Sequence, residues 1–427
     1  MNRREFLIAS ALGAAGTVAA AGAPVDKPVV TAEAKQTATL ALVRTEPVLQ
    51  APAETSMGVV WAVHADATGA VEYADNPEMK HCKTDWFGMT GERGVDAMVL
   101  SVRLTGLKPD TRYWYRTVTR AVVKGTPSGE PQRSRIYSFV TLGKKHASEF
   151  AVINDTHEHA AAVREVFDKV KQLDPSVLVW NGDMLSWISY RTQAVSALLS
   201  PEGRAYGTDM PLLYVPGNHD YRGKWTINRT GIMMPRPKGE HPGEFERLTR
   251  NFAVRVGDVA MIGMDTGEDK PDRHPAWHGL ACFEPYRELQ TRWLAQALER
   301  SEIKEAPFIV LFCHIPLFDP RPDANPGDLL TGYADWQRPA SDMWSPLLKK
   351  YGVQLVVAAH THYMRVDPPT SDRPWAQWVG GGPLMENPVE EPTVIHGAVV
   401  NGKLKMTMYA MIKKKIVAQS EIEPRKV

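Results

Sequence analysis

The sequence has few cysteines and no excess of charge of either sign. Its 427 residues include only Cys82, Cys282 and Cys313, which excludes a scaffold held together by disulfides and a cysteine-based zinc cluster. The 50 Lys and Arg residues are balanced by 49 Asp and Glu residues, for a net charge of +1. Because affinity for nucleic acid rests on a cationic surface, we expect no nucleic-acid-binding surface. The length and the 43% hydrophobic content predict two or three domains with buried cores.

Long hydrophobic runs are also missing, so we expect no stable membrane span in the mature protein. Residues 1–23 place Arg3 and Arg4 before the apolar residues 6–8 and an Ala/Gly-rich stretch. This pattern is typical of a twin-arginine signal peptide. It predicts recognition by the twin-arginine translocation machinery and a periplasmic or extracellular location. A membrane anchor fits less well, because Ala and Gly dominate the run. Residues 24–38 show no periodicity and are expected to form a linker.

Residues 39–143 are predicted to form an all-β sandwich. Short strand-like runs with turn signals between them fill this region, and residues 99–104 alternate with period two. The segment LTGLKPDTRYWYR at 104–116 resembles the tyrosine corner of a fibronectin type III-like domain, in which a tyrosine ties a crossover loop to a strand. Any β-sandwich with a proline turn remains an alternative.

From residue 144 to 427 the pattern changes to that of an α/β domain. Apolar runs such as FAVIND, VLVWNGD and FIVLFCHIP alternate with amphipathic stretches such as residues 160–173. Strands of this kind are buried on both faces, which indicates a layered α/β fold. Ligands of open α/β sheets bind beyond the carboxyl ends of the strands, and nearly every run here ends in Asp, Asn or His.

Five polar blocks follow five of these runs. They are D-T-H at 155–157, N-G-D at 181–183, G-N-H-D at 217–220, His314, and H-T-H at 360–362. In an extended segment, positions i and i+2 face the same side, so Asp155 and His157 are expected to bind one ion together, and His360 and His362 repeat this geometry. Gly182 is expected to let the backbone approach the cluster closely.

The donor types in these blocks favour transition metals. Carboxylate, amide and imidazole donors without thiolate suit Fe, Mn, Zn or Co rather than Ca. The set is too large for one ion with an open position and right for two. Read alone, each block is also compatible with a turn or with a hydrogen-bonded core histidine. It is the ordered set that predicts a metal site.

The five blocks resemble the calcineurin-like metallophosphoesterase superfamily from about residue 148 to the C-terminus, and a fibronectin-like domain ahead of them resembles the layout of purple acid phosphatases. The resemblance implies a four-layer αββα sandwich. It also implies the metal ligands: Asp155, His157 and His362 for the first ion, Asp183 as the bridge, and Asn218, His314 and His360 for the second. By the same resemblance His219 points at the scissile phosphate and Asp220 orients it, although a purely structural role for His219 stays open.

The expected function is an exported phosphoesterase with two divalent metal ions (Mn, Fe or Zn favoured) that hydrolyses phosphate mono- or diesters by attack of a metal-bound hydroxide. His219 would stabilise the phosphoryl oxygens or protonate the leaving group. One alternative is a degenerate, non-catalytic phosphoesterase whose fibronectin-like domain binds a surface partner. A redox or oxygen-activating metalloprotein is a third reading, but it leaves Asn218 and the G-N-H-D block without a purpose.

Some positions depart from the family pattern. Asn154 and Ala359 replace glycines, and Ser186 stands where purple acid phosphatases carry a tyrosine ligand, so we expect a colourless or faintly coloured enzyme. The segments 221–249 and 266–285 are expected either to shape the substrate pocket or to be solvated surface. The candidates for substrate contact are Arg222, Lys224, Trp225 and Arg229, together with the rim residues Glu158 and His159. Gly380–Gly382 is expected to let the backbone pass near the site.

Overall fold

The computed structural model describes residues 41–89, 91–320 and 333–426. The predicted signal peptide at 1–23 and linker at 24–38 lie outside the described residues. Within the described ranges, no helix is both long enough and apolar enough to cross a membrane.

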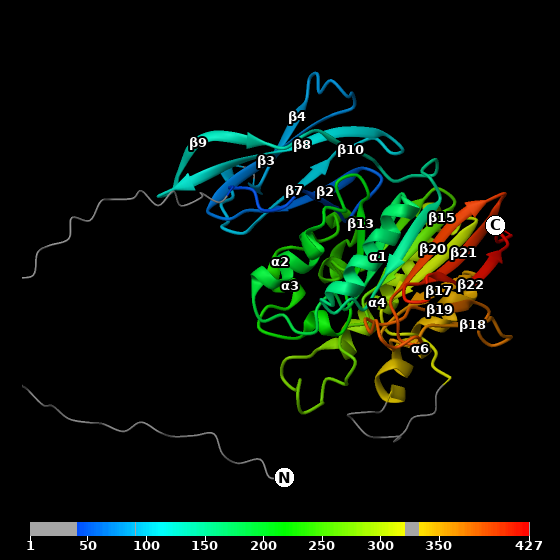
Figure 1. Ribbon diagram of the computed structural model, residues 1–427. Coiled ribbons are helices and arrows are strands. Elements are labelled where there is room, and N and C mark those ends of the chain that lie inside the picture. Colours follow the sequence, from blue (N-terminus) through cyan, green and yellow to red (C-terminus); the bar gives the residue numbers. More distant parts are fainter. Residues whose placement is uncertain (1–40, 90, 321–332, 427) are drawn as a thin grey trace, which may run out of the picture. The chain divides into compact units, whose positions relative to one another are not determined.

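The N-terminal part is a β-sandwich (Figure 1). One sheet has the order β10-β8-β3-β4, with β9 paired to β8. Its strands are β3 (Ala67–Ala74), β4 (Lys83–Trp86), β8 (Arg112–Val123), β9 (Thr126–Arg133) and β10 (Tyr137–Val140). The facing strands are β1 (Val48–Gln50), β2 (Ser56–Ala62) and β7 (Val99–Thr105), and β5 (Gly88–Met89) and β6 (Glu92–Arg93) form a small hairpin. Trp61, Leu100, Tyr115 and Phe139 pack between the sheets, as expected for a sandwich with an apolar inner face.

The tyrosine corner is confirmed. The backbone N–H of Lys108 donates a hydrogen bond of 3.0 Å to the hydroxyl of Tyr113. Leu107, just before the loop, is buried in the core of the sandwich. The bond therefore ties the crossover loop to β8.

Two mixed sheets make up the rest of the chain. The first contains β11 (Glu149–Ile153), β12 (Val177–Asn181), β13 (Leu212–Val215), β20 (Thr393–Val400), β21 (Lys403–Ala410) and β22 (Lys415–Ile422). The second contains β14 (Phe252–Val256), β15 (Val259–Met264), β16 (Phe308–Cys313), β17 (Leu355–Ala358), β18 (Arg365–Asp367) and β19 (Ala376–Val379). The helices are α1 (Ala160–Leu173), α2 (Arg191–Leu199), α3 (Ile227–Thr230), α4 (Phe283–Glu299), α5 (Ser301–Lys304) and α6 (Tyr333–Lys350), with short 3₁₀ turns η1 (Pro201–Gly203), η2 (His219–Tyr221), η3 (Lys238–Glu240) and η4 (Gly243–Arg247).

These elements form the predicted four-layer αββα sandwich. Apolar residues of both sheets pack face to face, for example Phe150 of β11 against Phe312 of β16 with ring centroids 5.6 Å apart. The outer face of the first sheet is covered by α1 and α2, and the outer face of the second by α4 and α6. Strands buried on both faces explain the nearly continuous apolar runs of the sequence.

The sandwich and the first α/β sheet share backbone hydrogen bonds. Strand β1 pairs in parallel with β13, Gln50 opposite Leu212, so that β1, β2 and β7 extend this sheet to nine strands. The buried side chain of Gln50 also donates to the carbonyl of Ile232 at 3.0 Å and accepts from the N–H of Met234 at 2.9 Å. These two hydrogen bonds hold the segment 221–249 against strand β1 of the sandwich.

Candidate metal centre

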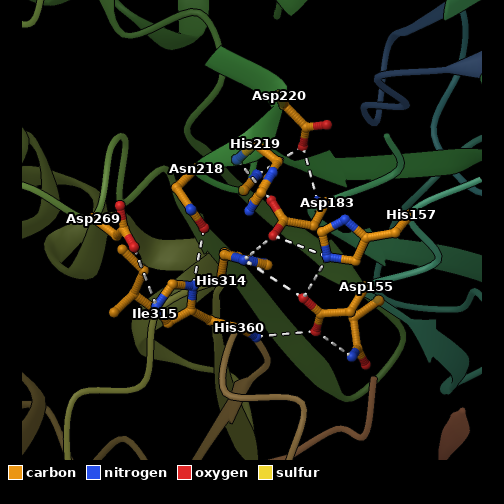
Figure 2. Close-up of polar contacts among 12 residues, drawn as sticks. Asp155, His157, Asp183, Asn218, His219, Asp220, Asp269, His314, Ile315 and His360 are labelled. Carbon is orange, nitrogen blue, oxygen red and sulfur yellow. Dashed lines mark hydrogen bonds and ion pairs between the residues drawn. The ribbon is translucent and has the colours of Figure 1, made fainter. Parts of the chain in front are cut away.

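All five polar blocks lie at the carboxyl ends of strands, where the structure brings them together (Figure 2). The sequence suggested an extended backbone at the D-x-H and H-x-H blocks, and this expectation is wrong. Positive φ angles occur at Asp155 (43°), His157 (42°), Asp183 (54°), His360 (68°) and His362 (57°). Hydrogen bonds between the loops hold this conformation, such as the one of 3.0 Å from the N–H of His157 to the carbonyl of Asp183. Left-handed conformations at non-glycine residues cost energy and gather at functional sites.

Asp155, His157 and His362 form the first group of donors. The Nε2 atoms of the two histidines lie 3.1 Å apart. Oδ1 of Asp155 is 3.9 Å from Nε2 of His157 and 3.4 Å from Nε2 of His362. Three donor atoms this close together could bind one metal ion.

The second group contains Asp183, His314 and His360. Nε2 of His314 lies 3.2 Å from Oδ2 of Asp183. Asn218 joins this group, because its Oδ1 is 2.9 Å from Nδ1 of His360. The seven residues expected to bind metal are thus all present in one cluster.

Asp183 lies at the junction of the two groups. Its Oδ2 is 3.5 Å from Nε2 of His157, in the first group, and 3.2 Å from Nε2 of His314, in the second. Its other oxygen, Oδ1, accepts the backbone N–H of His219 at 2.9 Å. A carboxylate in this position suits a bridging role between two ions.

The buried polar atoms fit metal ions. Oδ1 of Asp155 and Nε2 of His314 are buried and make no hydrogen bond to the described residues, although both face the cluster. Buried groups of this kind are normally satisfied by a partner. Two buried carboxylates also need compensating positive charge. A pair of divalent ions would meet both requirements.

The protonation states of the donors support this fit. Burial lowers the pKa of His157 and of His360 to about 4, so both rings are neutral near pH 7. Burial alone would lower the pKa of His314, but the carboxylates of Asp183 and Asp155 raise it to about 10. Burial alone would raise the pKa of Asp183, but His314 and the other imidazoles hold it below its ordinary range. Burial alone would lower the pKa of His362, but the carboxylates of Asp155 and Asp183 raise it. Ionised carboxylates and neutral imidazoles are the forms that bind metal, so metal binding would release the protons held by His314 and His362.

Glycines allow the loops to approach the cluster closely, as expected. A Cβ on Gly182 would lie 2.4 Å from Nδ1 of His314, and one on Gly217 would lie 2.2 Å from Oδ1 of Asp183. The expectation for Gly380–Gly382 is confirmed as well, since a Cβ on Gly382 would lie 2.4 Å from Cβ of His362.

His219 lies beside the first group. Its ring centroid is 4.8 Å from that of His157. Nδ1 of His219 lies 2.7 Å from the carbonyl oxygen of Ser186, and Nη1 of Arg222 lies 2.9 Å from Nε2. A carbonyl only accepts, so Nδ1 carries the proton and Nε2 accepts from the guanidinium.

The expectation that Asp220 orients the His219 ring is wrong. The buried carboxylate of Asp220 accepts the backbone N–H groups of Gly217 (2.8 Å), Asp183 (3.0 Å) and Met184 (3.3 Å). Successive side chains of the 3₁₀ turn η2 point in different directions, which separates Asp220 from the His219 ring. Asp220 therefore clamps the loop of Asp183 to the loop after β13.

Two residues support the ligands in ways that the sequence pattern did not indicate. Asn154 donates from Nδ2 to Oδ2 of Asp155 and to the carbonyl of Gly381, both at 2.7 Å. The carbonyl of Asn181 lies 2.8 Å from Nδ1 of His314. Such partners fix the orientation of ligand side chains. Only the polarity of Asn154 next to Asp155 could have indicated its role.

Of the candidate substrate-contact residues, Arg222 lies beside the cluster and Trp225 does not. Arg222 is held beside His219 and also pairs with Glu268 and Asp269, each at 2.6 Å. Trp225, by contrast, packs against the core on the α1 and α2 side, so its substrate-contact role is not supported by its position.

A layered αββα fold with two adjoining groups of oxygen and imidazole donors at the strand ends defines the class of metallophosphoesterases. Residues 148–364, more than half of the chain, match the family model described as calcineurin-like phosphoesterase, and the chain belongs to this family. Residues 45–141 match the N-terminal domain of purple acid phosphatases.

Individual proteins agree with this assignment. The chain is 25% identical over 267 residues to probable purple acid phosphatase 20 of Arabidopsis thaliana, covering 60% of this chain and 52% of that protein. It is also 25% identical over 273 residues to purple acid phosphatase 21 of the same plant, covering 62% and 53%. The chain thus spans about half the length of the curated relatives it matches. Its fold is similar to that of purple acid phosphatase PPD1 from yellow lupin (Lupinus luteus), with a TM-score of 0.63, 14% identity, and 88% and 74% of the two chains covered.

Proposed function

We propose that the protein is an exported phosphoesterase that holds two divalent metal ions and hydrolyses phosphate mono- or diesters. The observation that carries the proposal is the position of Asp183, whose Oδ2 lies between Nε2 of His157 and Nε2 of His314. The complete donor set argues against the degenerate alternative. Export through the twin-arginine pathway is supported by the Arg3-Arg4 pattern.

Asp155, His157 and His362 would hold one ion, Asn218, His314 and His360 the other, and Asp183 both. Such ions, when bound, supply Lewis-acid stabilisation of phosphoryl oxygens and a lowered pKa for water. The Asp155 and Asp183 carboxylates and the neutral rings of His157 and His360 are pre-organised for this task by burial and by their hydrogen bonds.

His219 and Arg222 supply the remaining polar groups. In the described geometry Nε2 of His219 accepts from Arg222. A phosphoryl group placed between them would receive the guanidinium donor instead, and Nε2 would then be free to hold a proton for the leaving oxygen. Glu268 and Asp269 keep Arg222 in place.

The test uses the full chain, supplied with Mn, Zn or Fe and analysed for bound metal. We expect two ions per chain and hydrolysis of an aryl phosphate or a bis-aryl phosphate. An Asp183→Asn variant serves as the matched control for background hydrolysis. Cleavage of neither ester by the metal-loaded protein would refute the proposal.

A further inference from the structure

A pocket of about 420 Å³ lies beside Arg222: its lining includes Tyr221 and Gly223, the chain neighbours of Arg222, and Glu268, which pairs with it. It lies between the loop that follows β12, the segment after η2 and the segment 266–283. Four aromatic residues line it, namely Trp187, Tyr221, Trp277 and Phe283, together with the apolar Leu280 and the charged side chains of Arg229 and Glu268. A volume of this size accommodates one ring system.

Direct contacts connect the pocket to His219. Trp187 follows Ser186, whose carbonyl lies 2.7 Å from Nδ1 of His219. The guanidinium carbon of Arg222, which contacts Nε2 of His219, lies 5.5 Å from the ring centroid of Trp277. The His219–Arg222 pair therefore lies next to Trp187 and Trp277 of the pocket and next to His157 of the cluster. A phosphoryl group bound at this pair can direct its ester substituent into the pocket.

Large apolar side chains of the pocket are exposed to solvent. The side chain of Trp187 is 49% exposed and that of Leu280 is 78% exposed. The rings of Trp187 and Trp277 are 6.2 Å apart and tilted by 34°. Contiguous exposed apolar residues beside a polar site mark a ligand-binding surface.

The base of the pocket is firmly held. The rings of Tyr221 and Phe283 meet edge to face at 5.0 Å. The hydroxyl of Tyr221 donates to the buried carboxylate of Asp265, which also accepts from Tyr286 at 3.0 Å. A fixed aromatic base loses little entropy when a ligand binds.

We propose that this pocket binds a planar aromatic leaving group, an aryl ring or a nucleobase, of the phosphate ester. The inference rests on the proposed function and names its substrate class. The indole faces of Trp187 and Trp277 offer stacking surfaces, and Arg229 offers donors to ring heteroatoms. A long acyl chain would also bury apolar surface on the indoles, but it would lack the stacking geometry of a ring and would meet the charged side chains of Arg229 and Glu268.

The first test compares phenyl phosphate with glycerol 1-phosphate in Trp187→Ala, Trp277→Ala and wild-type protein. Ring stacking of about 1–3 kcal/mol predicts a fall in kcat/KM of roughly 5- to 150-fold for the phenyl ester. For the glycerol ester we expect less than about a twofold change in Trp187→Ala, which leaves the contact between Trp277 and Arg222 in place. Each ester is compared with its own wild-type rate, so the intrinsic reactivity of the two esters cancels. Trp86→Ala, which removes an exposed tryptophan of the N-terminal sandwich, should change neither. Equal losses for both esters in Trp187→Ala, or no loss for the phenyl ester in either pocket variant, would overturn the proposal.

A second test measures binding without turnover. Phenylphosphonate and methylphosphonate are titrated against the full chain by calorimetry. We expect tighter binding of the phenyl compound and loss of that preference in Trp187→Ala, which, unlike Trp277→Ala, leaves the contact with Arg222 in place. Equal affinities in the wild type would overturn the pocket assignment. Failure of all turnover combined with a phenyl preference would instead refute the proposed function alone.

Discussion

The hydroxyl of Ser186 lies 3.2 Å from Nδ1 of His157, and this contact fixes which nitrogen of the ring faces the metal cluster. With Nδ1 engaged by the hydroxyl, Nε2 points at Nε2 of His362 and Oδ2 of Asp183. Ser186 stands where purple acid phosphatases, by resemblance, carry a tyrosine ligand. In this chain the position supports a histidine instead of supplying a donor of its own.

Ser186→Ala should therefore weaken metal binding without unfolding the protein. Loss of a partner that orients a ligand typically costs 10- to 100-fold in metal affinity, and the Ser186 side chain is exposed. Competition with a chelator measures the affinity of each site, and Ser189→Ala in the same loop is the matched control. Unchanged affinity for both ions would show that the Ser186 contact does not position His157.

Asp183→Asn and His219→Ala should separate a bridging ligand from a residue that acts on substrate. We expect the first variant to lose both ions and nearly all turnover, because its carboxylate joins both groups. The second should keep both ions and slow the reaction by roughly 10²- to 10⁴-fold, as for loss of a general acid. The bound metal and the rate are measured for each variant, and together they distinguish a metal ligand from a residue that acts on substrate. Loss of metal in His219→Ala would reassign His219, which lies near His157 and Asp183, as a ligand.

Much of the fold is encoded in local sequence patterns. The amphipathic pattern of residues 160–173 coincides with α1, and the apolar runs coincide with the buried strands. Strand β9 was not predicted, because its sequence TPSGEPQR has no apolar alternation and pairs only along the edge that the long β8 offers. The pairing of β1 with β13 was not predicted either, since contact between segments so far apart in sequence leaves no local signal.

The donor set of the site could be predicted, but its internal geometry could not. Residue type and position after a strand identify Asp155 or His314. The left-handed backbone at Asp155 and His157, and the backbone clamp made by Asp220, depend on hydrogen bonds between loops. The residue pattern within one segment cannot predict hydrogen bonds to another segment.

His241 should make the protein more sensitive to acid. Its buried ring stacks on Trp293 at 5.2 Å and 13°, and burial together with Arg236 and Arg300 lowers the pKa of His241 to about 4. Unfolding restores a pKa near 6.5, so the unfolded state binds the proton first as the pH falls. Between pH 6.5 and 4 this residue should cost up to about 1.4 kcal/mol of stability per pH unit.

The measurement compares thermal unfolding of wild type and His241→Phe from pH 4.5 to 8. The variant should gain stability relative to wild type below pH 6.5, and the difference should be constant above pH 7. His64→Phe, at an exposed position of the N-terminal sandwich, controls for the loss of a histidine. A His241→Phe difference that does not vary with pH would contradict a buried, neutral His241.

Replacing Arg3 and Arg4 by lysines should leave the protein in the cytoplasm, because the twin-arginine translocon reads that pair. Cell fractionation with an antibody against the chain measures the distribution. Arg112→Lys, at an exposed position of β8, is the matched control and should be exported normally. Undiminished export of the double variant would rule out the twin-arginine signal.

The iron-loaded protein should be colourless or only faintly coloured. The colour of purple acid phosphatases comes from charge transfer between a tyrosinate and ferric iron, which requires a phenol among the ligands. The corresponding Ser186 has no π electrons to donate, and its hydroxyl contacts His157. Tyr190, the next tyrosine along the chain, is 69% exposed at the start of α2.

With a neutral imidazole in place of a phenolate, the donor set carries one negative charge fewer, which favours divalent ions over ferric iron. Visible spectra before and after a mild reductant should therefore be nearly identical. A strong visible band that disappears in Tyr190→Phe would show that this tyrosine reaches the metal after all.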